Sequence, residues 1–252
     1  MNTIRVISVE GYKAVRSRIW QASLLVGALS PLLFGLGFLL ARDYLIKNNF
    51  YTWLTFERFP LFFFSAMLGS ALVGGLTGLV LTDESRFNTL KSVLTSGVTR
   101  SQYLFGKLFF LSAWVVAEMI IFTLTTLLIG FALGLNSPHL AVFAQAVLVE
   151  TACLLAIIPF FMLVALFTNN FFIAAGAGVA FSFVTMLLNA FGSGRQYMGY
   201  FPGSTSVAYI LVLTDQWGKQ YNDPLLWTIT LAAFSIISLV AVWTVMQRRD
   251  IQ

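Results

Sequence analysis

Six long apolar segments constrain the fold of this chain more than any other feature. A helix that crosses a bilayer needs about 20 apolar residues. Runs of that length occupy residues 19–40, 60–81, 103–127, 140–167, 171–191 and 225–246. Only 10% of the residues are charged, against about 25% in a typical soluble domain. Because helices satisfy their own backbone hydrogen bonds in lipid, the sequence predicts an all-α integral membrane protein with six transmembrane helices.

The distribution of lysine and arginine predicts the orientation of these helices. Six crossings place both termini on one side of the membrane. On that side the basic residues are Arg5, Lys13, Arg16, Arg18, Arg86, Lys91, Arg100, Lys107, Arg248 and Arg249. The other side has Arg42, Lys47, Arg58, Arg195 and Lys219. By the positive-inside rule, the termini and the loop between the second and third segments are cytosolic.

That central loop, with the start of the next segment, is the one long polar and charged insertion, at residues 83–107. Apolar residues that include Leu90 and Leu94 recur there at helical spacing, and Gly97 interrupts the pattern. Thr99, followed by a glutamine three residues later, is typical of a capping box at a helix start. The segment therefore predicts a short amphipathic helix, a turn, and a new helix that enters the membrane.

A family resemblance rests on these same residues. The pattern consists of Glu84, Asn88-Thr89-Leu90, Leu94, Gly97-Val98-Thr99-Arg100 and Lys107. It resembles the cytosolic coupling segment of ABC-2 type transporter permeases, which typically shows an acidic residue, a Gly-Thr-Leu step, a Pro-Val-Ser-Arg turn and a following lysine. Asn88, Gly97 and Thr99 depart from the family's Gly, Pro and Ser, although Asn and Gly also form turns. The alternative is an ordinary solvated loop of a six-span protein.

The resemblance implies which residues couple the chain to an ATPase: Glu84, Thr89, Leu90, Leu94, Gly97, Thr99, Arg100 and Lys107. It also implies a cytosolic coupling helix, an N-terminal amphipathic helix in the membrane plane, and a re-entrant extracytosolic element before the last span. The N-terminus fits, with one apolar and one basic helical face. Ile4, Ile7, Gly11 and Val15 share the first, and Arg5, Lys13 and Arg16 the second. A charged leader that only fixes orientation is the alternative for the N-terminus.

The loop before the last span, at residues 192–224, holds an apolar run at 206–213 that is too short to span. This run is the candidate for the re-entrant element. The tyrosines and the tryptophan of the whole loop also suit an aromatic belt at headgroup level. We find no internal repeat and no linker, so the simplest division is a single transmembrane domain over residues 1–252.

The implied function is that of the permease subunit of an ATP-driven exporter. No G-x-x-x-x-G-K-[ST] loop occurs in the sequence, so we expect no cofactor on this chain and place ATP and Mg²⁺ on a partner ATPase dimer. The further partners expected are a second permease subunit, identical or homologous, and membrane lipid, but no nucleic acid. The small size resembles permeases of the lantibiotic and antimicrobial-peptide immunity group, which implies a bacterial plasma membrane and an amphipathic substrate.

Two carboxylates, Glu118 and Glu150, lie near the middle of predicted spans. A charge at that depth is costly, so each side chain should face protein or a wet cavity, or be protonated. They are candidates for a polar substrate path, while simple hydrogen bonding to Ser or Thr is the structural alternative. An intramembrane enzyme with the two as acid–base pair, or a proton-coupled carrier, are the rival functions. His139 and Cys153 are the single His and Cys, so we expect neither a metal site nor a disulfide.

Small-residue motifs are the remaining feature of the apolar segments. Gly74-x-x-x-Gly78, Gly130-x-x-x-Gly134 and Gly176-x-Gly178 offer flat helix faces. Such faces allow close approach of two helices in a membrane. We expect them to pack within the chain.

Overall fold

The computed structural model describes residues 2–86, 97–135, 140–190, 199–203, 205, 208 and 224–248. The main elements are α1 (Asn2–Arg16), α2 (Arg18–Leu40), α3 (Arg42–Lys47), α4 (Trp53–Phe63), the π-helix η1 (Phe64–Gly69), α5 (Ser70–Arg86), α7 (Arg100–Ala132), α8 (Leu140–Thr168), α9 (Phe171–Ala190) and α11 (Pro224–Arg248). The described residues include no strand. The predicted all-α class is therefore confirmed.

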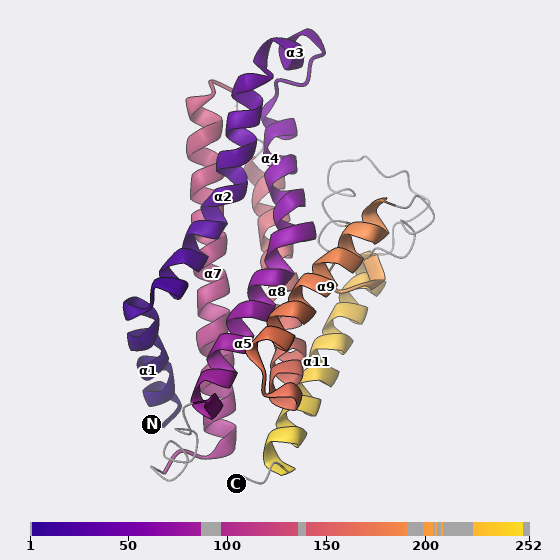
Figure 1. The fold of residues 1–252 in the computed structure, drawn as a ribbon. Coiled ribbons are helices and arrows are strands. Elements are labelled where there is room, and N and C mark those ends of the chain that lie inside the picture. The colour runs from indigo at the N-terminus through magenta and orange to yellow at the C-terminus, as the bar shows by residue number, and fades with distance from the viewer. Residues whose placement is uncertain are drawn as a thin grey trace.

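Six helical segments are long and apolar enough to cross a membrane. They are Arg18–Leu40, Trp53–Thr82, Arg100–Ala132, Leu140–Thr168, Phe171–Leu188 and Pro224–Arg248. Each overlaps one predicted segment. The start of α1 and the end of α11 lie at the same end of the bundle as the end of α5 and the start of α7 (Figure 1). This arrangement agrees with the predicted even number of crossings.

The second span begins earlier than predicted, at Trp53 instead of residue 60. The prediction began after Glu57 and Arg58 because their charges end the apolar run. In the structure Glu57 is buried among its neighbours, so its charge does not end the helix. Pro60 lies inside α4, and its carbonyl oxygen accepts a hydrogen bond from the Ser30 hydroxyl at 3.3 Å.

The π-helix η1 interrupts this second span between α4 and α5. A π turn inserts an extra residue into the helical repeat and changes which face points inward. The packing follows that change, because α4 contacts α2 whereas α5 packs mainly against α9. The second span thus packs against the first span, α2, through α4, and against the fifth span, α9, through α5.

Small residues allow α5 and α9 to approach closely. A Cβ atom placed on Gly74 would lie 2.7 Å from the Cα atom of Gly178. One turn away, the hydroxyls of Ser70 and Ser182 are 2.6 Å apart. These contacts confirm the predicted intrachain use of both glycines. Gly176 has nothing within 4 Å and takes no part.

The other predicted glycine pair has two separate roles at the far end of α7. A Cβ atom on Gly130 would meet the Trp53 ring at 2.2 Å, so Gly130 leaves space for that ring. Gly134 has φ +67 in the turn that ends α7, a left-handed conformation that favours glycine. The Tyr51 hydroxyl donates to the Leu133 carbonyl at 2.8 Å, which fixes the start of α4 to this turn.

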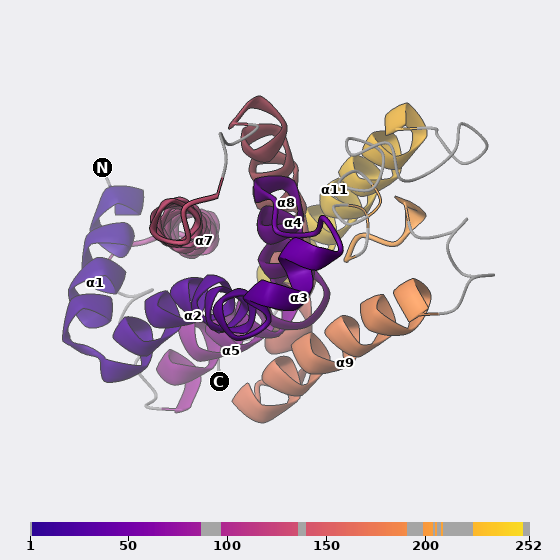
Figure 2. The same cartoon turned by 90° about the horizontal axis from the view of Figure 1, so that it is seen from above.

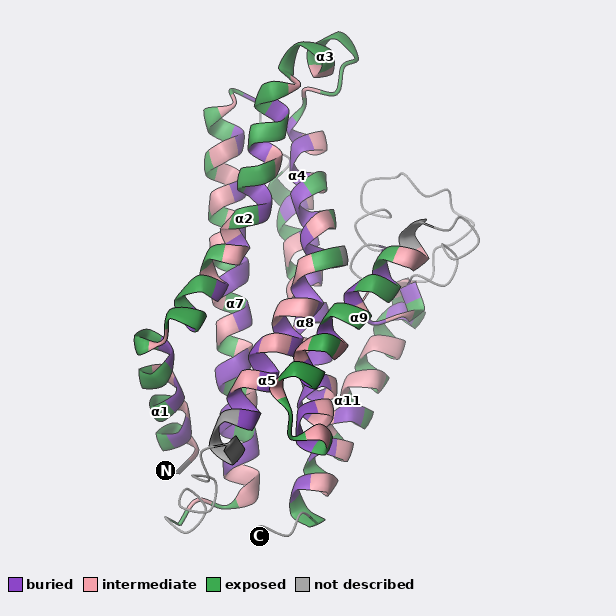
Figure 3. Ribbon diagram, viewed as in Figure 1, coloured by how far each residue is buried: buried purple, intermediate pink, exposed green. Residues whose placement is uncertain are grey.

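The outer surface of the bundle is apolar. Exposed large hydrophobic side chains lie on α2, α7, α9 and α11, as the exposed positions in Figure 3 follow the outward sides of these helices. Seen from above, α1 lies at the edge of the bundle beside α7 and α2 (Figure 2). Because apolar side chains suit lipid, this surface fits a multi-pass membrane protein.

Candidate functional site at the base of α7

The start of α7 is a capping box, as predicted. Thr99 Oγ1 accepts the backbone N–H of Gln102 at 3.2 Å, and Gln102 Oε1 accepts the N–H of Thr99 at 3.0 Å. The turn before it holds Gly97 at φ +86. Proline, with φ held near −65°, cannot adopt that conformation. The turn therefore differs locally from a Pro-Val-Ser-Arg turn.

The first turn of α7 is bonded to the end of α11. The Arg100 guanidinium donates to the carbonyl oxygens of Met246 and Gln247. Ser101 Oγ accepts from Gln247 Nε2 at 3.0 Å and from Trp243 Nε1 at 3.3 Å. The last carbonyls of a helix lack intrahelical partners and carry partial negative charge. Arg100 therefore supplies both a donor and a favourable charge there.

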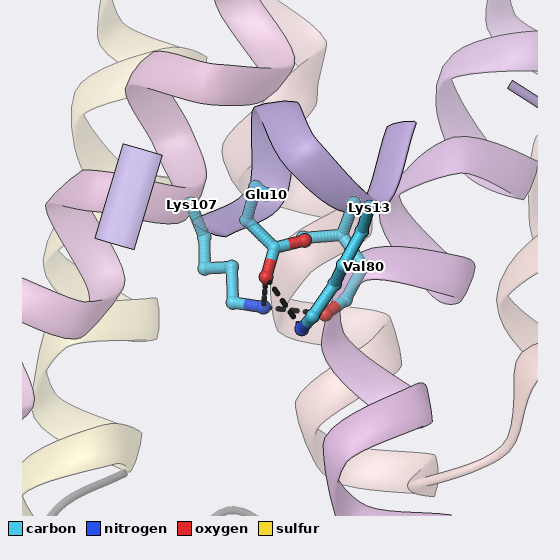
Figure 4. A network of polar contacts seen from close by, with 4 residues as sticks. All are labelled: Glu10, Lys13, Val80 and Lys107. Carbon is cyan, nitrogen blue, oxygen red and sulfur yellow. Dashed lines mark hydrogen bonds and ion pairs between the residues drawn. The ribbon is translucent and has the colours of Figure 1, made fainter. Parts of the chain in front are cut away.

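Two turns further along α7, a buried ion pair joins three helices (Figure 4). Lys107 Nζ lies 2.7 Å from Glu10 Oε1 and 3.1 Å from the Val80 carbonyl oxygen. Lys13 Nζ lies 2.8 Å from the same Glu10 oxygen. The side chains of Lys107 and Glu10 are 0% and 5% exposed. Since a buried charge is costly unless paired and hydrogen-bonded, these contacts hold α1, α5 and α7 together at one ammonium group.

Glu10 was not among the sequence candidates. It lies on a third face of α1, between the apolar and basic faces, together with the buried residues Val6 and Ala14. That face packs on α7, where a Cβ on Gly106 would lie 2.7 Å from Val6 Cβ. The predicted apolar face stays outside, with Ile4 exposed. The only signal in the sequence was that Glu10, the one carboxylate of an otherwise basic helix, lies four residues from both Val6 and Ala14.

The remaining predicted coupling residues are placed only in part. Glu84 belongs to the last turns of α5. Thr89, Leu90 and Leu94 lie outside the described residues, as does most of the apolar run 206–213. Their roles in a coupling helix and a re-entrant element stay predictions.

Glu118 is buried between α7 and α2. The polar side chains of Ser23 and Trp114 lie within interaction range of its carboxyl group. Ser23 Oγ accepts from Trp114 Nε1 at 2.9 Å and donates to the Trp20 carbonyl at 2.8 Å. Gly27 allows the close approach, since a Cβ there would lie 2.8 Å from the Glu118 carbonyl oxygen. A small polar cluster thus interrupts the apolar contact between these two helices.

Glu150 is also buried but has different neighbours. Its Oε1 atom would lie 3.4 Å from a Cβ on Gly69, the last residue of η1. Glu150 therefore faces the second span, whereas Glu118 faces the first. The neighbours described for the two carboxylates therefore belong to different spans.

Glu57 is a third buried carboxylate within the spans, which the sequence analysis placed outside the membrane. Trp53 lies one turn before it on α4 and is also buried. In the part of the chain that the structure describes, Glu57 Oε2 and Trp53 Nε1 have no hydrogen-bond partner. The four-residue spacing of Trp53 and Glu57, which places both on one helix face, was the available signal. No group of three metal-ligating side chains occurs among the described residues.

Comparison with known proteins identifies one family. A family model described as "ABC-2 family transporter protein" matches residues 6–188. The match extends from α1 through most of α9, and thus includes Glu10 and Lys107. No curated protein matches the chain.

Proposed function

The chain belongs to the ABC-2 family of transporter proteins, and on that premise we propose that this permease subunit serves an ATP-driven exporter. ATP and Mg²⁺ bind to a separate ATPase dimer, and a second permease subunit, identical or homologous, completes the complex. Both termini and the segment at 83–107 face the cytosol of a bacterial cell. The segment docks into a groove of the ATPase through the apolar face of its helix.

The observation that best supports this proposal is the set of contacts at the base of α7. Lys107 ties α7 to α1 and α5, and Arg100 ties it to α11. Both residues belong to the segment proposed to meet the ATPase. A displacement of that segment therefore reaches three other helices through charged contacts.

We propose an amphipathic substrate, such as an antimicrobial peptide or a lipid-like compound, in keeping with the lantibiotic immunity group. The buried Glu57, Glu118 and Glu150 provide polar contacts inside an apolar bundle. The 25 phenylalanines of the chain suit the apolar part of such a molecule. A buried polar group in a span is commonly part of a substrate path.

Co-purification tests the assignment. The tagged chain, extracted in mild detergent from its native membrane, should carry an ABC ATPase whose ATP hydrolysis differs between the complex and the free subunit. The double variant Leu90→Asp/Leu94→Asp should remain membrane-inserted but lose the associated ATPase. Ser92→Asp adds a charge to the same segment away from the apolar positions and serves as control. Unchanged association in the double variant, or no ATPase with the native chain, would contradict the proposal.

A further inference from the structure

One ammonium group joins the two helices that border the coupling segment. Lys107 stands at the end of residues 83–107, and Val80, whose carbonyl it binds at 3.1 Å, lies just before their start. The same Nζ atom is 2.7 Å from Glu10 on α1. The helix before the segment (α5), the helix that contains its end (α7) and the N-terminal helix α1 therefore meet at the Lys107 ammonium group.

The burial of Lys107 is created by α1. With 33 residues, α7 is about 50 Å long at 1.5 Å per residue, well beyond the hydrocarbon thickness of about 30 Å. Lys107 is only about 10 Å from the start of α7 by the same rise, where water or headgroups would otherwise reach it. The docked face of α1, with Val6 against Gly106, covers this position instead. If α1 moved away without α7, the ion pair would have to break.

The far end of α1 leads directly into the first span. Only Ser17, in an extended conformation, separates α1 from α2. Six residues after Ser17, Ser23 belongs to the polar cluster around Glu118. Gly27 packs against the backbone of Glu118. A shift of α1 thus acts on the helix that lines one side of the Glu118 cluster.

We propose that Glu10 is a positioning residue for ATP-driven transport: held by Lys107, it makes α1 follow the coupling segment. This inference rests on the proposed function. The path runs from the segment through Lys107 and Glu10 into α1, and from α1 through Ser17 into α2. Lys13 adds charge balance to Glu10 from within the same helix.

Distances between spin labels test the inference without knowledge of the substrate. The probe complex is the full chain with its ATPase in liposomes, in a Cys153→Ala background. One label pair, at Tyr12 and Phe172, follows α1, and a second pair, at Phe109 and Phe172, follows α7. All three labelled positions are exposed on their helices. Each pair is measured without nucleotide and after trapping with ATP and vanadate.

In the otherwise native complex both distances should change on trapping. In Glu10→Gln the distance that follows α7 should change on trapping as it does in the native complex. The distance that follows α1 should change by no more than half of the native change, or its distribution should broaden. Arg5→Gln, which removes a charge from an exposed position of α1, should behave like the native chain. Should Glu10→Gln fail to assemble, Lys107→Met, which leaves Glu10 its bond to Lys13, should give the same separation of the two responses.

An α1 distance that follows nucleotide normally in the variant would overturn the positioning role of Glu10. A native complex in which neither distance responds would instead count against the proposed function. The two failures are therefore distinct.

Discussion

The Lys107 ammonium lies 2.7 Å from the Glu10 carboxylate, although 97 residues separate them in the chain. Neither residue stands in a recognisable motif with the other. The pair is buried because the Val6, Glu10 and Ala14 face of α1 rests on α7. This contact makes the N-terminal helix part of the bundle and leads to predictions that do not require a known substrate.

The first prediction concerns the stability of the junction. Glu10→Gln should lower the free energy of unfolding by about 3–5 kcal/mol, because it leaves the buried Lys107 ammonium without its anion. Lys107→Met should cost less, because Glu10 keeps its ion pair with Lys13. The double variant should cost less than the sum, by about 1–3 kcal/mol. Unfolding in detergent, followed by circular dichroism, measures this.

Lys13→Gln provides the matched control for that cycle. The Lys13 side chain is 45% exposed and its ion pair with Glu10 lies within one helix, so loss of that ion pair should cost about 1 kcal/mol or less. Strictly additive effects of Glu10→Gln and Lys107→Met would show that the pair contributes no coupling energy.

The second prediction concerns the docking of α1. In a Cys153→Ala background, Val6→Cys with Gly106→Cys should form a disulfide on mild oxidation in native membranes. A Cβ on Gly106 would lie 2.7 Å from Val6 Cβ, closer than the roughly 3.5–4.5 Å of a disulfide, so α1 and α7 need to separate by only about 1 Å for the bond to form. Ile4→Cys with Gly106→Cys should not react, because Ile4 is exposed on another face. Equal yields from both pairs would argue against this packing.

The third prediction separates transport from acid–base chemistry. Glu118→Gln and Glu150→Gln should retain substantial ATP-driven transport, because Gln preserves the size and the hydrogen-bonding capacity of these buried side chains without a titratable proton. Glu118→Lys should be damaging, since it places a cation in a buried polar cluster. An enzyme that used these groups for proton transfer would lose about 10²–10⁴-fold in rate with Gln. ATP-driven uptake into inverted vesicles, corrected for the amount of assembled complex, provides the measurement.

The fourth prediction concerns orientation. With Cys153 replaced by Ala, single cysteines at Asn2, Ser92 and Gln252 should react with an impermeant thiol reagent only after the membrane is opened. A cysteine at Asn48 should react in intact cells. The start of α1 and the end of α11 lie at one end of the bundle, and α3, which ends at Lys47, lies at the other (Figure 1). Reaction at Ser92 in intact cells would remove the basis for docking to a cytosolic ATPase.

The sequence alone determined the features that depend on local pattern. Long apolar runs predicted six spans because a lipid-facing helix must be apolar over its whole length. The Thr99 capping box was predicted because its two hydrogen bonds join residues three apart in one turn. Gly74 and Gly178 predicted close helix packing within the chain because they carry no side chain, although the pairing of α5 with α9 came from the structure. Each of these inferences needs only neighbours in the chain.

Tertiary structure decided which charges are buried and what they meet. The predicted second span began too late, after Glu57, because a charge in the sequence does not show whether neighbouring helices will enclose it. Glu10 was missed because helical periodicity identifies an apolar face but not the helix against which a second face packs. Its pairing with Lys107 arises only when α1 docks on α7, a contact between residues 97 apart. The energy of a buried ion pair depends on that enclosure, and enclosure is a property of the folded chain.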